Sequence, residues 1–182
     1  MSRDVRIATE TLPEDEHVFK HWMHQHTTTV LQAAGVADGL RVLDYGCNRG
    51  IFTLPTARRV GPSGRVYAAD VNAIALNQLR SKAVGPLRNV IETLWIENKD
   101  VPLDGLEAPV DVVLLYDVLQ AIDDQPALLR ALHGALKPGG RLSMFPMHVG
   151  VDRGIALAEN TGGFVLEERY GMLLNFRATY TP

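Results

Sequence analysis

Residues 42–50 of this 182-residue chain read Val42-Leu43-Asp44-Tyr45-Gly46-Cys47-Asn48-Arg49-Gly50. A short apolar strand ends here in a carboxylate and then turns through two glycines into a helix. Such a turn leaves backbone N–H groups without partners at a helix N-terminus, where anionic groups bind well. The segment therefore predicts a ligand-binding bend at the carboxyl edge of a sheet.

A second strand follows and ends in an acidic residue twenty residues after Gly50. The residues Arg65-Val66-Tyr67-Ala68-Ala69 form this strand, and Asp70 ends it. An acidic residue at this place in a parallel sheet can accept the hydroxyl groups of a ribose. The two strand ends together predict a nucleoside site.

The glycine spacing separates two classes of nucleoside cofactor. The dinucleotide fingerprint needs glycines at the first, third and sixth positions. Counted from Gly46, the third and sixth positions hold Asn48 and Ile51. An acidic residue followed by Gly-x-Gly-x-Gly matches better, because Asp44, Gly46 and Gly50 fit and only Asn48 departs. That pattern resembles the class I methyltransferases that use S-adenosylmethionine (SAM).

Composition sets the class of protein and narrows its partners. Hydrophobic residues make up 46% and charged residues 21%, as in soluble globular domains, and the length fits one domain. The net charge of −3, without a block of five like charges, argues against nucleic acid as the main partner. One cysteine cannot form an internal disulfide, and no apolar run has the length of a signal peptide or a membrane span. We expect a cytoplasmic protein without a membrane partner, and a homodimer is compatible with the sequence.

Strand-like and helix-like segments alternate after residue 40, which is typical of a parallel sheet with crossover helices. Strands are expected at 41–45, 65–69, 89–95, 110–116 and 140–145, and helices at 52–60, 73–83, 124–136 and 151–161. The run Lys137-Pro138-Gly139-Gly140 predicts an abrupt helix end and a reversal into the fifth strand. The tail, 163–170 and 172–180, indicates a hairpin joined through Gly171.

A parallel sheet that ends in such a hairpin also resembles the class I methyltransferase fold, whose last strand is antiparallel. The resemblance covers residues 40 to about 180. It implies an α/β, three-layer Rossmann-like fold with a central, mostly parallel seven-stranded sheet. We expect a single SAM-binding domain at 40–182, preceded by a helical leader or cap at 1–39 whose helix spans about 14–34.

The resemblance implies roles for the residues of the glycine-containing turn. Asp44 would hold the amino group of the cofactor's methionyl part, although a strand-end carboxylate also caps turns. Gly46 and Gly50 would bring the backbone near the ligand. Asn48 tolerates a positive φ, but its side chain occupies space that the family usually leaves for the cofactor.

Further cofactor contacts are implied beyond the second and third strands. Asp70 would bind the ribose, or would cap the helix that starts near residue 73. Val71 and Ile96 could enclose the adenine, though apolar strand ends are often core. By the match to an acidic–small–x-x-Leu-Pro-Leu segment, Glu97 would accept the adenine amino group and the Asn98 backbone N–H would face a ring nitrogen. Asp100 is the competing acid.

The segment after the fourth strand faces the acceptor in the resemblance. There Tyr116 and Asp117 would run beneath the methionyl moiety. The nucleic-acid amine methylases of the family carry an Asn/Asp-Pro-Pro-aromatic tetrapeptide at this place, and its absence disfavours base N-methylation. His148, just after the fifth strand, and Tyr116 are the candidate general bases, since an imidazole titrates near neutrality. His148 also fits a surface loop without a catalytic role.

Three histidines share one face of the expected leader helix, because His17, His21 and His24 are spaced four and three apart. Such spacing can hold a metal. No cysteine or tight acidic partner is near them, so we expect no metal and predict instead that they form one wall of the acceptor pocket.

The sequence thus predicts a SAM-dependent methyltransferase that transfers a methyl group to a small-molecule acceptor by in-line displacement. Two alternatives stay open: a non-catalytic or repurposed SAM-fold protein, and a nucleotide-dependent oxidoreductase, which the glycine count disfavours.

Overall fold

The computed structural model describes residues 11–97, 103 and 105–179. Its strands are β1 (Arg41–Tyr45), β2 (Arg65–Asp70), β3 (Ile91–Trp95), β4 (Val110–Tyr116), β5 (Leu136–Phe145), β6 (Phe164–Tyr170) and β7 (Leu173–Ala178). They form one seven-stranded sheet in the order β3-β2-β1-β4-β5-β7-β6, in which β7 runs antiparallel to both of its neighbours. The other neighbouring pairs are parallel. The predicted Rossmann-like fold with an antiparallel last strand is confirmed.

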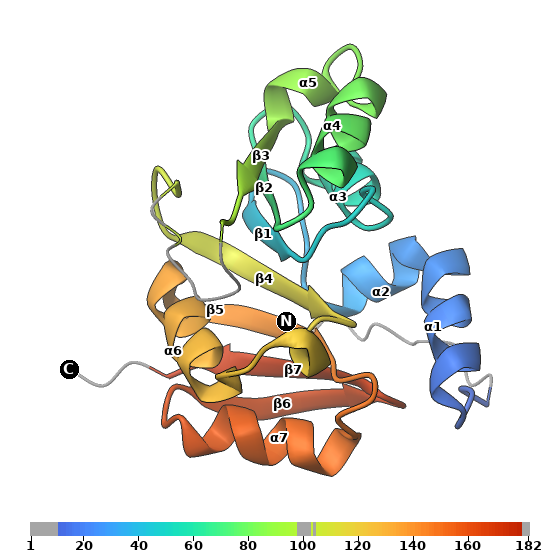
Figure 1. Ribbon diagram of the computed structural model, residues 1–182, viewed down its shortest axis with the longest axis vertical. Coiled ribbons are helices and arrows are strands. Elements are labelled where there is room, and N and C mark those ends of the chain that lie inside the picture. Colours follow the sequence, from blue (N-terminus) through green and yellow to red (C-terminus); the bar gives the residue numbers. More distant parts are fainter. Residues whose placement is uncertain (1–10, 98–102, 104, 180–182) are drawn as a thin grey trace.

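Helices cover both faces of the sheet, which makes the three layers (Figure 1). They are α1 (Glu16–Gln25), α2 (Thr27–Ala33), α3 (Thr53–Val60), α4 (Ala73–Lys82), α5 (Leu87–Val90), a 3-10 turn η1 (Leu119–Ala121), α6 (Gln125–Ala135) and α7 (Val151–Asn160). None of these helices, within the described part of the chain, is long and apolar enough to cross a membrane.

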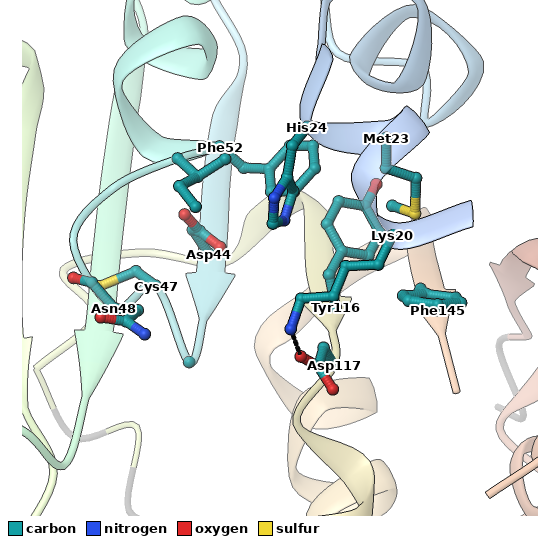
Figure 2. A pocket seen from close by; sticks show the side chains of 12 residues that line it. Lys20, Met23, His24, Asp44, Cys47, Asn48, Phe52, Tyr116, Asp117 and Phe145 are labelled. Atoms are coloured by element: carbon teal, nitrogen blue, oxygen red, sulfur yellow. Dashed lines mark hydrogen bonds and ion pairs between the residues drawn. The ribbon is translucent and has the colours of Figure 1, made fainter. Parts of the chain in front are cut away.

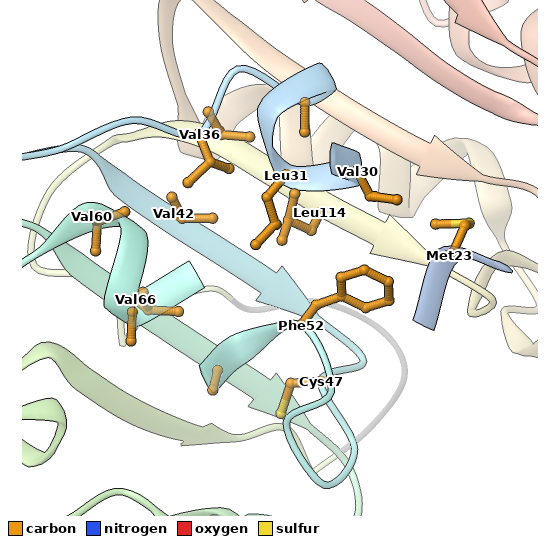
Figure 3. Close-up of a cluster of buried hydrophobic side chains, with 14 of the residues drawn as sticks. Met23, Val30, Leu31, Val36, Val42, Cys47, Phe52, Val60, Val66 and Leu114 are labelled. Carbon is orange, nitrogen blue, oxygen red and sulfur yellow. The ribbon is translucent and has the colours of Figure 1, made fainter. Parts of the chain in front are cut away.

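The strands bury alternate side chains in two clusters, because successive side chains of a strand point to opposite faces. Val42 and Leu114 join a cluster with residues of α1 to α5, such as Leu31 (Figure 3). Leu43 joins the other cluster, which includes Leu129 of α6. Both faces of β1 and β4 are therefore buried, and the exposed polar groups of these strands lie at their ends.

The parallel register brings several strand ends to one edge of the sheet. Tyr45 at the end of β1 pairs with Ala69 of β2, and Tyr116 at the end of β4 pairs with Phe145 at the end of β5. The helix α1 lies beyond the carboxyl end of β4 (Figure 1). Loops and helix thus meet where sequence patterns placed the ligand site.

The predicted leader helix at 14–34 is wrong in one respect, since two helices occupy the segment. His26 separates them with φ −115° and ψ 37°. Its backbone N–H and its ring Nδ1 both donate to the Trp22 carbonyl, at 3.0 and 2.8 Å. The break lets Met23 of α1 and Val30 of α2 both reach the buried cluster.

Two predicted strand boundaries also need correction. The strand expected at 89–95 begins at Ile91, because residues 87–90 form the short helix α5. The strand expected at 140–145 begins at Leu136, so the run 137–140 lies within β5 rather than in a separate reversal. A register shift between Val110 and Val112 of the neighbouring β4 accommodates Gly139, whose φ is +73°. The remaining helices and strands agree with prediction within about two residues.

Candidate functional site

The turn after β1 is held against β2 by its own backbone. The N–H groups of Gly46 and Cys47 donate to the Ala69 carbonyl at 2.8 and 3.0 Å. Gly46 and Gly50 have φ of +78° and +83°, and Asn48 adopts the left-handed conformation at +48°. Asparagine is one of the few residues that tolerate this conformation, so the bend forms without a third glycine.

Gly46 is also required by close packing. A Cβ added to Gly46 would lie 2.2 Å from Cγ2 of Val118, in the loop after β4. Because no side chain fits there, the loops after β1 and β4 approach each other directly. This contact places Asn48 and Asp117 beside the same hollow.

Asp70 connects the turn to the end of β2. Its Oδ2 accepts the Asn48 N–H at 2.7 Å, and its Oδ1 accepts the Asn72 N–H at 2.8 Å. Asn72, not Asp70, caps α4, because its side chain accepts from the backbone of Ile74 and Ala75. The half-buried carboxylate of Asp70 has further lone pairs for a ligand.

One cavity at this edge extends from Asp70 along the loop after β4. Val71, 47% exposed, and Ile96, 6% exposed, give it an apolar part next to the carboxylate. Its lining residues are Tyr45, Gly46, Asn48, Asp70, Val71, Ile96, Asp117, Val118, Ala121 and Ile122. We call this cavity the Asp70 cavity; it combines a hydrogen-bonding acid with an apolar slot.

A second cavity, which we call the Asp44 cavity, lies on the other side of the turn, beneath α1. Residues of four separate segments enclose it (Figure 2). They are Lys20, Met23, His24, Asp44, Gly46, Cys47, Asn48, Ile51, Phe52, Tyr116, Asp117 and Phe145. Gly46, Asn48 and Asp117 line both cavities, so the two hollows adjoin at the turn.

Asp44 is a buried acid at the base of the Asp44 cavity. It is 5% exposed, and its Oδ2 accepts the Thr53 hydroxyl at 2.6 Å. Burial raises the pKa of Asp44 to about 6, and the charge of Asp70 acts in the same direction, whereas the Thr53 hydrogen bond opposes the shift. With a pKa of about 6, Asp44 is mostly ionised at pH 7, and a bound cation would favour this ionised form further.

The helix α1 supplies the opposite wall through Lys20, Met23 and His24. The Lys20 ammonium pairs with the Asp117 carboxylate, which also accepts the Gln120 amide at 2.8 Å. Burial, followed by the charges of Lys20 and His21, lowers the pKa of His24, so its imidazole is neutral at pH 7. The ring of His24 meets that of Phe52 edge-on at 5.9 Å.

The two predicted bases occupy different places. Tyr116 lines the Asp44 cavity, and its hydroxyl lies 2.8 Å from the Ser143 hydroxyl. Burial raises the pKa of the Tyr116 phenol further above its usual range. His148 does not line either cavity among the described residues; its backbone N–H donates to the Glu16 carboxylate at 3.1 Å and its ring meets that of His17.

Other predicted residues lie at the margins. Glu97 is exposed just after β3 and belongs to neither lining in the described part of the chain. Asn98 and Asp100 lie outside the described residues. Cys47 is buried beside the turn, and burial raises the pKa of its thiol, which makes it a poor nucleophile.

Sequence reasoning missed Lys20 and Phe52, which line the Asp44 cavity, and Thr53, whose hydroxyl donates to Asp44. Of the three leader histidines expected to form a pocket wall, His24 lines the Asp44 cavity, whereas His17 and His21 are not among its lining residues. Whether Lys20 and His24 face the cavity depends on how α1 crosses the edge of the sheet, and no local pattern signals that crossing. For Thr53, the sequence signal was a hydroxyl residue nine positions after the acidic Asp44. The structure joins these two side chains by a hydrogen bond.

The chain matches known methyltransferases over most of its length. A family model described as a methyltransferase domain matches residues 15–152. The ubiquinone/menaquinone biosynthesis C-methyltransferase UbiE of Pasteurella multocida is 35% identical over 115 residues, which cover 62% of this chain and 41% of that protein. UbiE of an Enterobacter species is 29% identical over 147 residues, covering 79% and 57%. The chain spans about half the length of the curated relatives it matches.

Solved structures share the fold. A SAM-dependent methyltransferase from Aquifex aeolicus has a TM-score of 0.70 at 21% identity, covering 90% of this chain and 97% of that one. A protein described as a putative rRNA-methylase from Clostridium thermocellum has a TM-score of 0.64 at 16% identity, covering 95% and 100%. At these identities the likeness shows the fold alone, and this fold by itself does not exclude a nucleic-acid acceptor.

Proposed function

The chain belongs to the methyltransferase-domain family of class I SAM-dependent enzymes, and from this premise we propose that it methylates a small-molecule acceptor by in-line displacement. The observation that carries the proposal is the pair of adjoining cavities at the turn after β1. The Asp70 cavity offers an acid and an apolar slot, and the Asp44 cavity offers a buried acid facing a cation. SAM has two parts that match these cavities, a nucleoside at one end and an amino acid at the other.

The residues present fit the nucleoside part of the cofactor. Asp70 would accept ribose hydroxyls, and Val71 with Ile96 would contact the adenine. Gly46 lines both cavities, so its backbone would border a ligand that spans them. For Glu97 we retain the proposal of a contact to the adenine amino group.

The amino acid part of the cofactor fits the Asp44 cavity. Asp44 would accept the ammonium group with the oxygen that does not bind Thr53. Asp117 and the backbone of Asn48 lie where the two cavities join, so they would border the middle of the ligand.

When bound, SAM supplies an electrophilic methyl group. The protein's task is then chiefly to hold the acceptor in line and to exclude water. Orientation of this kind can contribute on the order of 7–11 kcal/mol. Tyr116 lines the cavity and, as a neutral phenol, would donate a hydrogen bond to the acceptor. His148 would act as a base only for an acceptor that extends from the Asp44 cavity to the region of Glu16, whose carboxylate accepts the His148 N–H.

A small molecule is proposed as the acceptor for two reasons. The net charge of −3 disfavours the phosphate backbone of a nucleic acid. The curated relatives are named as C-methyltransferases of ubiquinone and menaquinone biosynthesis. A hydroquinone, which is nucleophilic at carbon, is therefore the first acceptor to test.

The proposal is tested by methyl transfer from radiolabelled SAM to 1,4-naphthohydroquinone and to a metabolite extract under reducing conditions. We expect label in a small organic product and none in added RNA. A protein that binds SAM tightly but labels neither small-molecule sample would instead be a repurposed SAM-fold protein. Thermal stabilisation by NAD, without stabilisation by SAM or S-adenosylhomocysteine, would favour the oxidoreductase alternative.

Replacement of Asp70 by alanine should weaken SAM binding by about tenfold while the domain stays folded. The variant loses an acceptor for the ribose and two hydrogen bonds that order the turn, each contributing about 1 kcal/mol. Calorimetric titration with SAM measures the affinity, and circular dichroism checks the fold. Exposed Asp123→Ala is the matched control, and an Asp70→Ala variant with wild-type affinity would remove Asp70 from the site.

A further inference from the structure

The walls of the Asp44 cavity carry opposite charges. Asp44 stands on the sheet side, and Lys20 approaches from α1 (Figure 2). Lys20 is the single lysine or arginine among the described lining residues. His24 beside it has a lowered pKa and does not add a second positive charge at neutral pH. One wall thus suits an ammonium group and the other suits a carboxylate.

The cofactor's amino acid part carries both of these groups on one carbon atom. If Asp44 takes the ammonium, the carboxylate remains in a cavity that also contains Asp117. Two acidic side chains would repel that carboxylate unless a cation offsets them. Lys20 lies in the same lining and is the cation available there.

Lys20 is free to change partners at little cost. Its side chain is 37% exposed and that of Asp117 is 21% exposed, and ion pairs with this degree of solvent access contribute little to stability. Asp117 keeps the Gln120 amide as a partner when Lys20 leaves. The flexible four-carbon stem of lysine allows its ammonium to swing between neighbouring acceptors.

We propose that Lys20 binds the carboxylate of the cofactor's methionyl group, exchanging Asp117 for this ligand. The assignment rests on SAM occupying the proposed site. Helix α1 then contributes directly to cofactor recognition, although it lies outside the turn and the strand ends that the sequence pattern identifies. It also follows that the cofactor should hold α1 in place over the cavity.

Decarboxylated SAM provides the matched ligand for the test, because it keeps the adenosyl, sulfonium and ammonium groups but lacks the carboxylate. Calorimetric titrations compare SAM and decarboxylated SAM with the wild type, Lys20→Met and Lys20→Gln. We expect Lys20→Met to weaken SAM binding by about tenfold or more and to change the affinity for decarboxylated SAM less than about threefold. Lys20→Gln should show the same selective loss.

Lys137→Met is the matched control variant. Lys137 forms an ion pair with Asp111 of similar exposure, and neither residue lines the Asp44 cavity or the Asp70 cavity. This variant should bind both ligands like the wild type. Equal weakening of SAM and decarboxylated SAM by both Lys20 variants, or no weakening at all, would overturn the assignment. A wild-type protein that binds neither ligand would show that the cofactor site itself is wrong.

Discussion

Asp44→Asn is expected to bind SAM between about tenfold and a hundredfold more weakly than the wild type at pH 7.5. The substitution keeps the shape of the side chain and an oxygen that can accept the Thr53 hydroxyl. It removes the negative charge that would hold the cofactor's ammonium group. Calorimetric titration with SAM gives the affinity, and Asp123→Asn, which removes a charge at an exposed position, is the control.

The same variant should be more stable than the wild type in the absence of ligand. The pKa of Asp44 is raised from 3.8 to about 6, so the folded state holds the proton more tightly than the unfolded state does. Between pH 4 and 6 the folded protein binds more protons, and Asp44 therefore lowers the free energy of unfolding as pH rises. The loss reaches about 3 kcal/mol above pH 7.

Urea denaturation from pH 4 to 8 measures this effect as the difference between variant and wild type. The stability advantage of Asp44→Asn should grow through this range and level off above pH 7. Wild-type SAM affinity should rise over the same interval, because binding of an ammonium favours ionised Asp44, while the affinity of the variant stays flat. If the variant were less stable than the wild type at pH 7, ionised Asp44 would not destabilise the folded protein, and the argument from its raised pKa would be wrong.

Gly46→Ala should destabilise the protein by about 2–4 kcal/mol and remove measurable SAM binding. The methyl group would lie 2.2 Å from Val118 Cγ2, and the backbone at φ +78° disfavours any side chain. Left-handed strain costs about 1–2 kcal/mol and overpacking about 1–3 kcal/mol. Because the loops after β1 and β4 would separate, both cavities would lose their common border.

Val118→Ala in the Gly46→Ala background separates the two contributions. Removing the Val118 methyl groups relieves the clash but not the backbone strain, so we expect partial recovery of the free energy of unfolding, measured by urea denaturation. Full recovery would mean that the backbone conformation is unstrained. Gly134→Ala is the control, since a Cβ there meets no heavy atom within 4 Å.

Local patterns were sufficient where a residue acts through its own backbone or its immediate neighbours. Asn72 and Asp124 cap α4 and α6 by accepting N–H groups two or three residues later, contacts that depend only on neighbouring residues. Pro55 lies in the first turn of α3, where its missing N–H costs little. Patterns were insufficient at the leader, where the backbone leaves helical geometry at His26 and the His26 ring contacts the Trp22 carbonyl.

The candidate site divides in the same way. Asp44, Gly46, Asn48 and Asp70 were identified from their places at two strand ends, and the structure brings all four to one edge. His148 was chosen by the same rule, yet its loop turns toward Glu16 and His17. A strand end specifies the edge that a residue occupies but not the direction of a side chain in the following loop.

The sequence by itself determined the order of strands and helices, the bend after β1 and the two acidic strand ends. These features follow from hydrophobic periodicity, glycine conformation and capping, which act over a few residues. Only the tertiary structure decided that Lys20 faces Asp44 across a cavity and that Val118 excludes a side chain at Gly46. Both arrangements join segments far apart in the chain, and their geometry depends on how the helices pack against the whole sheet.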